Sequence, residues 1–199
     1  MNNETAIQQA KKIIQREGEA VLSLLDQVSV SVGEAVELID ACSGHVLVTG
    51  TGTSRFVAQR FSHLLCCCGV PSLFINAADS LHGGAGAITN NDIVFVISKG
   101  GRSQEVNQFA GIAKSRGARL IALSENTDSP LAGQCDLLVQ CIAPEGVDPY
   151  GMIATGSSLI NSALCDALCV LLLNKKGYTK NQFGETHPGG AVGHKLKEQ

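Results

Sequence analysis

The sequence contains no tryptophan and few other aromatic residues: aromatic side chains make up 4% of its 199 residues, whereas 44% of the residues are hydrophobic. Its core must therefore be built mainly from aliphatic side chains. A chain of this length and composition is typical of one folded domain with a sizeable core, and leaves too little sequence for a second one. We predict a single domain over residues 1–199.

No strong excess of charge of either sign is present, because the formal net charge is -3. This balance argues against a general affinity for nucleic acid, which requires an excess of basic residues. Arg55, Lys99 and Arg102 still offer a local basic group. An anionic ligand must therefore be bound by a local site, because the overall charge does not attract it.

The N-terminus lacks the apolar run of a secretory signal, because the first 20 residues are polar and charged. The most apolar segment, 159–173, contains Asn161 and Asp166 within its span, which disfavours a transmembrane helix. We therefore expect no membrane association and a cytoplasmic location.

Cysteine is plentiful, with eight residues, but no C-x-x-C pair occurs. The consecutive residues 66–68 would point about 100° apart on a helix and cannot hold one metal together. Cys165 and Cys169 lie four residues apart in an apolar segment, a spacing that is more often buried packing than half of a metal site. We expect reduced thiols that behave as small hydrophobic residues, and no metal.

Five short aliphatic segments alternate with helical patterns along the chain. The segments lack polar alternation, which is typical of strands buried on both faces of a parallel sheet. The predicted strands are 46–49, 72–76, 93–97, 120–123 and 137–141. The predicted helices are 6–28, 31–41, 54–68, 103–116, 129–134 and 154–175, followed by a short polar tail. This βαβ rhythm predicts a three-layer, doubly wound α/β fold with helices on both faces of a five-stranded parallel sheet.

The two loops after the first and third strands are expected to form a crevice. Five-stranded sheets of this kind commonly have the flavodoxin-like order 2-1-3-4-5, in which the chain reverses direction between strands one and three. The loops that separate there are GTGTSR at 50–55 and SKGGRSQE at 98–105. Each taken alone is an ordinary strand-to-helix turn with a hydroxyl N-cap, but as a pair at a switch point they favour a ligand site.

Phosphate is the natural ligand for such a crevice. Glycine allows the backbone to approach a ligand, helix N-termini offer free N–H groups, and serine hydroxyls add donors. A dinucleotide fingerprint is disfavoured because Arg55 stands where G-x-G-x-x-G needs its third glycine, and because no acidic residue ends the second strand. A Walker G-K-[ST] sequence is absent as well. A phosphomonoester therefore fits better than a nucleotide.

Several motifs together resemble the sugar isomerase (SIS) domain family, and most closely the arabinose 5-phosphate isomerase group. They are GTGTS at 50–54, S-x-G-G-x-S-x-E at 98–105, HGGAG at 82–86, GMIATGSS at 151–158 and THPGGAVGHKL at 186–196. The resemblance covers about residues 8 to 197, and the His-Pro-Gly-Gly-Ala segment is its most specific part. The paired CBS modules that often follow in that group do not follow here before Gln199.

The resemblance implies an SIS-type phosphosugar-binding domain that interconverts an aldose and a ketose through an enediolate, without a cofactor. Such chemistry needs a base, a group that polarises the carbonyl oxygen and a proton donor. Carried over residue by residue, the active-site positions are Glu105, Glu145, His187 and His82, and Asp148 is the alternative to Glu145 because that match needs one extra residue. The implied ligand-binding residues are Gly52, Thr53, Ser54, Ser98, Lys99, Gly100, Ser103, Thr155 and Ser158.

Each of these residues also has an ordinary structural interpretation. Glu105 fits the favoured position of an acid in the first turn of a helix, and His187 can simply end a helix. Serines 157 and 158 can N-cap the long helix that follows. His45, His63 and His194 are interpreted as structural or surface residues.

The chain also departs from the arabinose 5-phosphate isomerase pattern. Thr53 stands where a lysine is usual, and SKGGR replaces S-N-S-G-E, so that Lys99 and Arg102 must restore the cation from the second loop. A non-catalytic phosphosugar sensor or regulatory module is therefore the alternative function. The apolar terminal helices favour a homo-oligomer; the resemblance implies a tetramer in which His82 or His187 serves a neighbour's site.

Overall fold

The computed structural model describes residues 2–197 and contains one five-stranded parallel sheet. Its strands are β1 (Val46–Gly50), β2 (Ser72–Phe74), β3 (Ile93–Ile97), β4 (Arg119–Ser124) and β5 (Leu137–Gln140). Their order is β2-β1-β3-β4-β5, and every neighbouring pair is parallel, which confirms the predicted doubly wound topology. The helices are α1 (Asn3–Leu22), α2 (Val30–Asp40), α3 (Thr53–Cys67), α4 (Ala77–Ser80), α5 (Gln104–Ser115), α6 (Gly156–Lys176), α7 (Lys180–Thr186) and α8 (Gly190–Lys197), with short 3-10 turns at η1 (Ser23–Asp26), η2 (Gly84–Ala87) and η3 (Pro149–Gly151).

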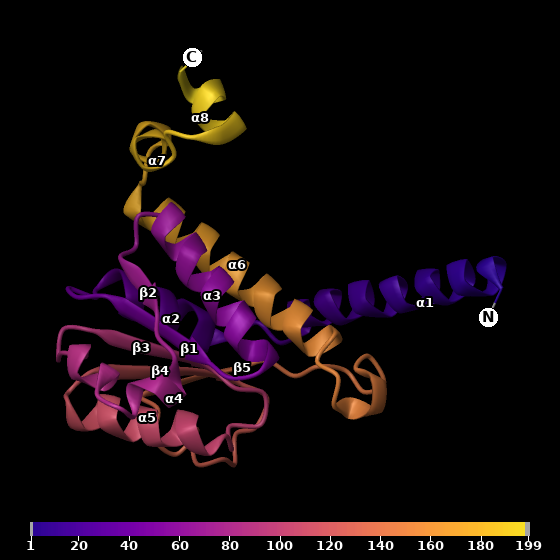
Figure 1. The fold of residues 1–199 in the computed structure, drawn as a ribbon, viewed down its shortest axis with the longest axis horizontal. Helices are drawn as coiled ribbons and strands as arrows, with labels where there is room; N and C mark the ends of the chain where they lie inside the picture. Colours follow the sequence, from indigo (N-terminus) through magenta and orange to yellow (C-terminus); the bar gives the residue numbers. More distant parts are fainter. Residues whose placement is uncertain (1, 198–199) are drawn as a thin grey trace.

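Two aliphatic cores lie on the two faces of the sheet. Successive side chains of a strand point to opposite faces, so Val46 and Val48 of β1 join one core while Leu47 joins the other. The larger core is closed by α2, α3 and α6, and the smaller one by α5 together with α4 (Figure 1). Helices therefore cover both faces, which explains why the strands carry no polar alternation.

Helix α1 extends away from the body of the molecule (Figure 1). The helix predicted over 6–28 is divided, because α1 ends at Leu22 and a 3-10 turn follows. Its apolar side chains are largely exposed, with Ile7 at 55%, Ile14 at 67% and Leu22 at 64%. Within the single chain this face of α1 has little to pack against.

The segment described from the sequence only as a short polar tail forms α7 and α8 beyond the end of α6 (Figure 1). Thr179 caps α7 through a capping box with Gln182. This T-x-x-Q spacing is a recognised helix start and is the sequence signal that could have revealed α7. Both ends of the chain thus add helices beyond the sheet domain.

The helix predicted over 129–134 is wrong, because this segment forms successive turns. Pro130 begins the turns, and the hydroxyl of Ser129 accepts a hydrogen bond from the backbone N–H of Ala132. The backbone N–H of Leu131 donates to the carbonyl of Gly101. The amides of Gly133 and Cys135 donate four residues back, to Ser129 and Leu131, but the amide of Gln134 between them donates only three residues back, to Leu131. The segment therefore forms single turns and no continuous α-helix.

Helix α6 is long and apolar enough to span a membrane by length and composition, and it is the one such helix among residues 2–197. Half of its apolar window is buried inside the protein. Ile160, Leu164, Leu168 and Leu172 lie in the larger core against the sheet and α3. The hydropathy of α6 is thus explained by its place as a core helix.

A substitution of Phe61 tests how much α3 contributes to the larger core. Its ring is fully buried and contacts Phe95 of β3 edge to face, with ring centroids 4.9 Å apart. Replacing Phe61 by Ala removes a large buried ring and leaves a cavity, so we expect a loss of about 3–5 kcal/mol in the free energy of unfolding. Chemical denaturation measures this difference.

Phe56 on the same helix is the matched control, because its side chain is 65% exposed. Phe56→Ala should change the free energy of unfolding by no more than about 0.5 kcal/mol. Equal losses for the two variants would contradict the described packing of α3.

Candidate active site

The two glycine-containing loops lie side by side at the switch point of the sheet. Strands β1 and β3 are neighbours, and Gly50 at the end of β1 is in register with Ile97 at the end of β3. The hydroxyls of Thr51 and Ser103, one from each loop, are 3.5 Å apart. The structure therefore brings together the loops that the sequence predicted to converge.

The first loop leads into α3 without a side-chain cap. Gly52, the N-cap residue, has φ 57° and ψ -133°, a conformation that only glycine adopts readily. No side-chain cap accepts a hydrogen bond from the first turn of α3, which begins with Thr53 and Ser54. These first amides and the positive end of the helix dipole are therefore available to an anion.

The second loop turns its carbonyl groups toward the protein. The carbonyl of Lys99 accepts from the hydroxyl of Ser124 at 2.9 Å, and that of Gly101 accepts from the side-chain amide of Asn107 at 3.1 Å. In a trans peptide the N–H points opposite to the C=O. The N–H groups of Gly100 and Arg102 therefore point away from these partners, and within residues 2–197 no protein acceptor is recorded for them.

The two cations of the second loop have different partners. Arg102 is exposed and donates to the carbonyl of Asp128 at 2.8 Å, so it is fixed to the adjacent loop. Lys99 is only partly exposed, and its ammonium group lies 3.1 Å from Asp148. Lys99 is thus tied to the start of α6, whereas Arg102 is tied to the surface loop after β4.

Asp148 connects the second loop to the N-terminus of α6. One carboxylate oxygen accepts from the backbone N–H groups of Gly156 and Ser157, and the other faces Lys99. Burial alone would raise the pKa of Asp148, but hydrogen bonds from Ser157, Lys99 and Gly156 outweigh burial and lower that pKa. Asp148 is therefore a buried anion that caps α6.

The hydroxyls near the start of α6 do not take the capping role. Ser158 donates back to the carbonyl of Thr155 at 3.0 Å, and Thr155 donates to Asp148 at 3.4 Å. The interpretation of serines 157 and 158 as N-caps is therefore wrong, because the carboxylate from the preceding loop satisfies the first amides. Thr155 and Ser158 still lie at the edge of the crevice beside Asp148.

The candidate carboxylates differ in their surroundings. Glu105 lies in the first turn of α5 and is partly buried, directly beyond the second loop. Glu145 is exposed in the loop after β5, where the carbonyl of its neighbour Gly146 accepts from Arg16 of α1 at 3.0 Å. Asp148, the alternative to Glu145, is the acid that the structure holds against Lys99.

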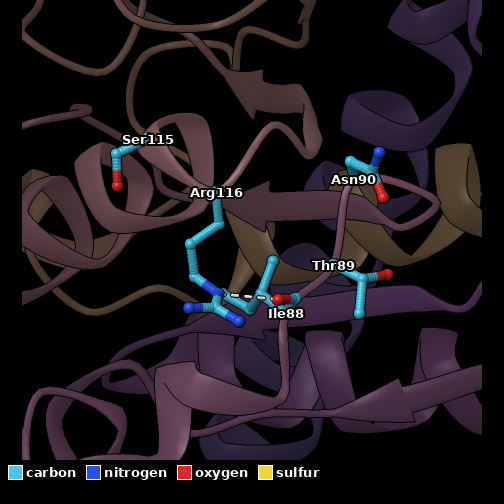
Figure 2. A pocket seen from close by; sticks show the side chains of 5 residues that line it. All are labelled: Ile88, Thr89, Asn90, Ser115 and Arg116. Atoms are coloured by element: carbon cyan, nitrogen blue, oxygen red, sulfur yellow. Dashed lines mark hydrogen bonds between the residues drawn. The ribbon is translucent and has the colours of Figure 1, made fainter.

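His82 lies in the exposed turn between α4 and η2. The turn that follows is anchored by Arg116, which donates to the carbonyls of Ile88 at 2.6 Å and Gly86 at 3.0 Å. Figure 2 shows this arrangement within a pocket lined by Ile88, Thr89, Asn90, Ser115 and Arg116. Because the guanidinium of Arg116 donates to two carbonyls, this pocket is a poor anion site. Arg116 instead fixes the turn that follows His82.

His187 lies far from the crevice of its own chain. It is the C-cap residue of α7, and its Nε2 is 3.4 Å from the thiol of Cys67 at the last residue of α3. Thr53 begins the same helix, and 14 residues at 1.5 Å each place the two ends about 21 Å apart. Within one chain, the structure therefore does not bring His187 together with Glu105 or Asp148.

The fold defines a class: a doubly wound α/β domain in which two glycine-containing loops meet at the switch point of the sheet. The SIS domain family matches residues 39–171, which is most of the chain. The chain belongs to the SIS domain family.

Curated relatives include the arabinose 5-phosphate isomerase KdsD of Pseudomonas aeruginosa, 34% identical over 190 residues, and KpsF of Escherichia coli, 31% identical over 191 residues. Each alignment covers 96% of this chain, but only 58% and 60% of the relatives, respectively. This chain therefore spans less than two thirds of their length.

Solved structures of similar chains cover it almost completely. A Listeria monocytogenes protein, provisionally named a sugar-phosphate isomerase, has a TM-score of 0.92 and 33% identity over 95% of this chain and 100% of its own. An Escherichia coli protein in complex with arabinose 5-phosphate has a TM-score of 0.90 and 28% identity over 94% and 100%, respectively.

The charge on Asp148 can be tested by its contribution to stability. Asp148→Asn keeps a capping oxygen but removes the charge that pairs with Lys99, so we expect a loss of about 2 kcal/mol in the free energy of unfolding at neutral pH. Because the pKa of Asp148 is lowered in the folded state, the loss is complete above the ordinary carboxyl pKa of about 4 and shrinks as the pH falls through the lowered folded-state value.

Denaturation of both proteins over a pH series measures this effect. Asp128→Asn, at an exposed aspartate, is the control and should show almost no difference at any pH. A stability difference for Asp148→Asn that grows toward acid pH would contradict the assignment.

Proposed function

We propose that the protein is a phosphosugar isomerase that interconverts an aldose and a ketose, acting on arabinose 5-phosphate and ribulose 5-phosphate or on a related sugar phosphate. The observation that carries this proposal is the meeting of the two loops, one of which leads into the uncapped start of α3 while the other has N–H groups that point away from its protein partners. The names of the relatives support the same substrate class.

The phosphate would be bound by the loop amides together with the hydroxyls of Thr53, Ser54, Ser98 and Ser103. Anions are stabilised at helix N-termini because the free N–H groups and the dipole both favour negative charge. Gly52 and Gly100 leave room for the phosphate, because a Cβ at either would meet no atom within 4 Å and neither carries a side chain. Thr155 and Ser158 would contact the sugar from the start of α6.

Lys99 would supply the cation that the resemblance places in the first loop. Thr53 occupies the usual lysine position, and Lys99 reaches the crevice from the opposite loop while paired with Asp148. A charged donor strengthens a hydrogen bond to phosphate. Asp148 then holds the ammonium in place, and the same carboxylate fixes the start of α6.

The proton transfers are assigned to Glu145 and His187, with Glu105 and His82 completing the set of groups around the sugar. Removal of a proton beside the carbonyl gives an enediolate, and return of the proton to the neighbouring carbon gives the isomer. The reaction needs no redox or electrophilic cofactor. Glu145 is exposed in the single chain and is therefore open to a substrate or to a second subunit.

Because His187 lies at the opposite end of α3, its part in this reaction requires a second copy of the chain. The exposed apolar face of α1 offers a surface for such a contact. We propose a homotetramer in which His187 of one subunit completes the crevice of another. We also propose that residues 1–199 act as one phosphosugar-binding domain and work in the cytoplasm, where sugar phosphates are formed and retained.

Solvent exchange tests the reaction. Incubation with ribulose 5-phosphate in heavy water should introduce deuterium at the exchanging carbon, because the enediolate loses its proton to a base that exchanges with solvent. Mass spectrometry or proton NMR measures the label. Binding of pentose and hexose phosphates without exchange would instead indicate a non-catalytic sensor.

Glu145→Gln tests the assigned base. The variant should abolish the exchange while it retains affinity for the sugar phosphate, because glutamine keeps the shape of the side chain but cannot accept the proton. Exchange that survives in this variant would show that another group is the base.

Subunit mixing tests the role of the second copy. Glu145→Gln and His187→Ala should each be inactive alone, and dissociating and reassembling them together should restore about a quarter of the sites, since each residue comes from an independent subunit. Activity of the mixture is compared with each variant reassembled alone. If both residues act within one chain, the mixture gains nothing.

A further inference from the structure

The thiol of Cys67 contacts two histidines at the end of α3. Its Sγ lies 3.4 Å from Nε2 of His187 and 3.7 Å from Nε2 of His63, both within the range of hydrogen bonds to sulfur. His63 precedes Cys67 by four residues, so the two side chains share one face of the helix. Cys67 is half-buried, and it is the point at which α7 meets α3.

The contacts of Nδ1 of His187 determine which atom donates in the hydrogen bond between His187 and Cys67. This Nδ1 lies 2.9 Å from the carbonyl oxygen of Phe183 and 3.1 Å from the hydroxyl of Thr186, which itself donates to that carbonyl. A carbonyl oxygen can only accept, so Nδ1 must carry the proton, and in the neutral ring Nε2 is then the acceptor. The thiol of Cys67 must therefore donate its S–H to Nε2 of His187.

The surroundings of Cys67 agree with a thiol that keeps its proton. Burial, followed by the neighbouring Cys66, raises the pKa of Cys67 above its ordinary value. A protonated thiol is a donor, whereas a thiolate could only accept. The ring of His187 is also stacked on Phe183, with centroids 3.8 Å apart and planes inclined by 14°. Stacking and two hydrogen bonds thus define both the plane and the proton position of the imidazole.

We propose that Cys67 is a positioning residue for His187: it holds the ring in the form with a proton on Nδ1 and a lone pair on Nε2. In this form Nε2 can accept a proton once the Cys67 thiol releases the lone pair to which it donates. The effect on catalysis rests on the proposed function, in which His187 transfers protons. The effect on the ring is independent of that function.

Nitrogen-15 NMR of the full chain, labelled at histidine, measures the tautomer directly. The spectra are recorded near pH 8, above the pKa of an ordinary imidazole, which is about 6.5. In the wild-type protein His187 should show a protonated Nδ1 and an unprotonated Nε2. Cys67→Ala should shift the Nε2 signal and raise the share of the other tautomer, because only the Phe183 carbonyl then favours a proton on Nδ1. Cys67→Ser, which keeps a donor, should retain the wild-type pattern.

Cys66→Ala is the matched control on the same helix, because the thiol of Cys66 donates to the carbonyl of Ser72 rather than to a histidine. It should leave the His187 signals unchanged. The proposal is overturned if wild-type His187 carries its proton on Nε2, or if Cys67→Ala leaves the spectrum as it was.

Kinetics then test the catalytic consequence. If the protein isomerises a sugar phosphate, Cys67→Ala should lower kcat by about threefold to tenfold with KM unchanged, and Cys67→Ser should restore it. An unchanged kcat together with an altered tautomer would limit Cys67 to a structural role and overturn its catalytic part. Complete absence of isomerisation in the wild-type protein would reject the proposed function, while the NMR result would still decide the positioning of His187.

Discussion

The parallel pairing of β1 with β3 is the constraint on which the site depends. Their register places Gly50 beside Ile97, and a Cβ at Gly50 would lie 2.9 Å from the carbonyl oxygens of both Ile97 and Ser54. Only a residue without a side chain fits between the strand ends and the first turn of α3. The close approach lets both loops reach the same crevice, because the carboxyl ends of parallel strands lie at one edge of a sheet.

Asp148 connects a third helix, α6, to the same edge of the sheet. It caps α6 and pairs with Lys99, so the position of the cation in the second loop depends on a carboxylate that arrives from the loop after β5. Three helices therefore begin at this edge of the sheet. Helices α3 and α5 have no side-chain cap, whereas the first amides of α6 donate to Asp148. The starts of α3 and α5 are therefore where the proposed phosphate would bind.

Local patterns predicted the strands and the two loops, because that information lies within each segment, whereas the strand order was predicted from the order common to sheets of this kind. Aliphatic runs mark strands that are buried on both faces, and glycine with hydroxyl residues marks the turns after β1 and β3. The roles of Asp148 and Cys67 could not be predicted in this way. Asp148 caps amides eight and nine residues away, and Cys67 meets His187 across 120 residues of sequence. Such contacts exist only once the chain has folded.

Errors at the level of single elements also have physical causes. The segment 129–134 begins with a serine cap, but Gly133 lies within it and the amide of Gln134 donates three residues back rather than four, so the turn does not continue as a helix. Glu145 stays a prediction that the single chain does not test, and Asp148, its alternative, is the acid that lies against Lys99. The contact of His187 with the far end of α3 could not be predicted from the loops or from the motif that contains it. The lengths of α3 and α6 determine where His187 lies.

A crystal structure of the protein with a bound sugar phosphate tests the central claim most directly. The account predicts that the phosphate oxygens lie about 3 Å from backbone N–H groups of both the loop after β1 and the loop after β3. A phosphate bound by only one of these loops, or at the edge of the sheet near Arg116, would contradict it.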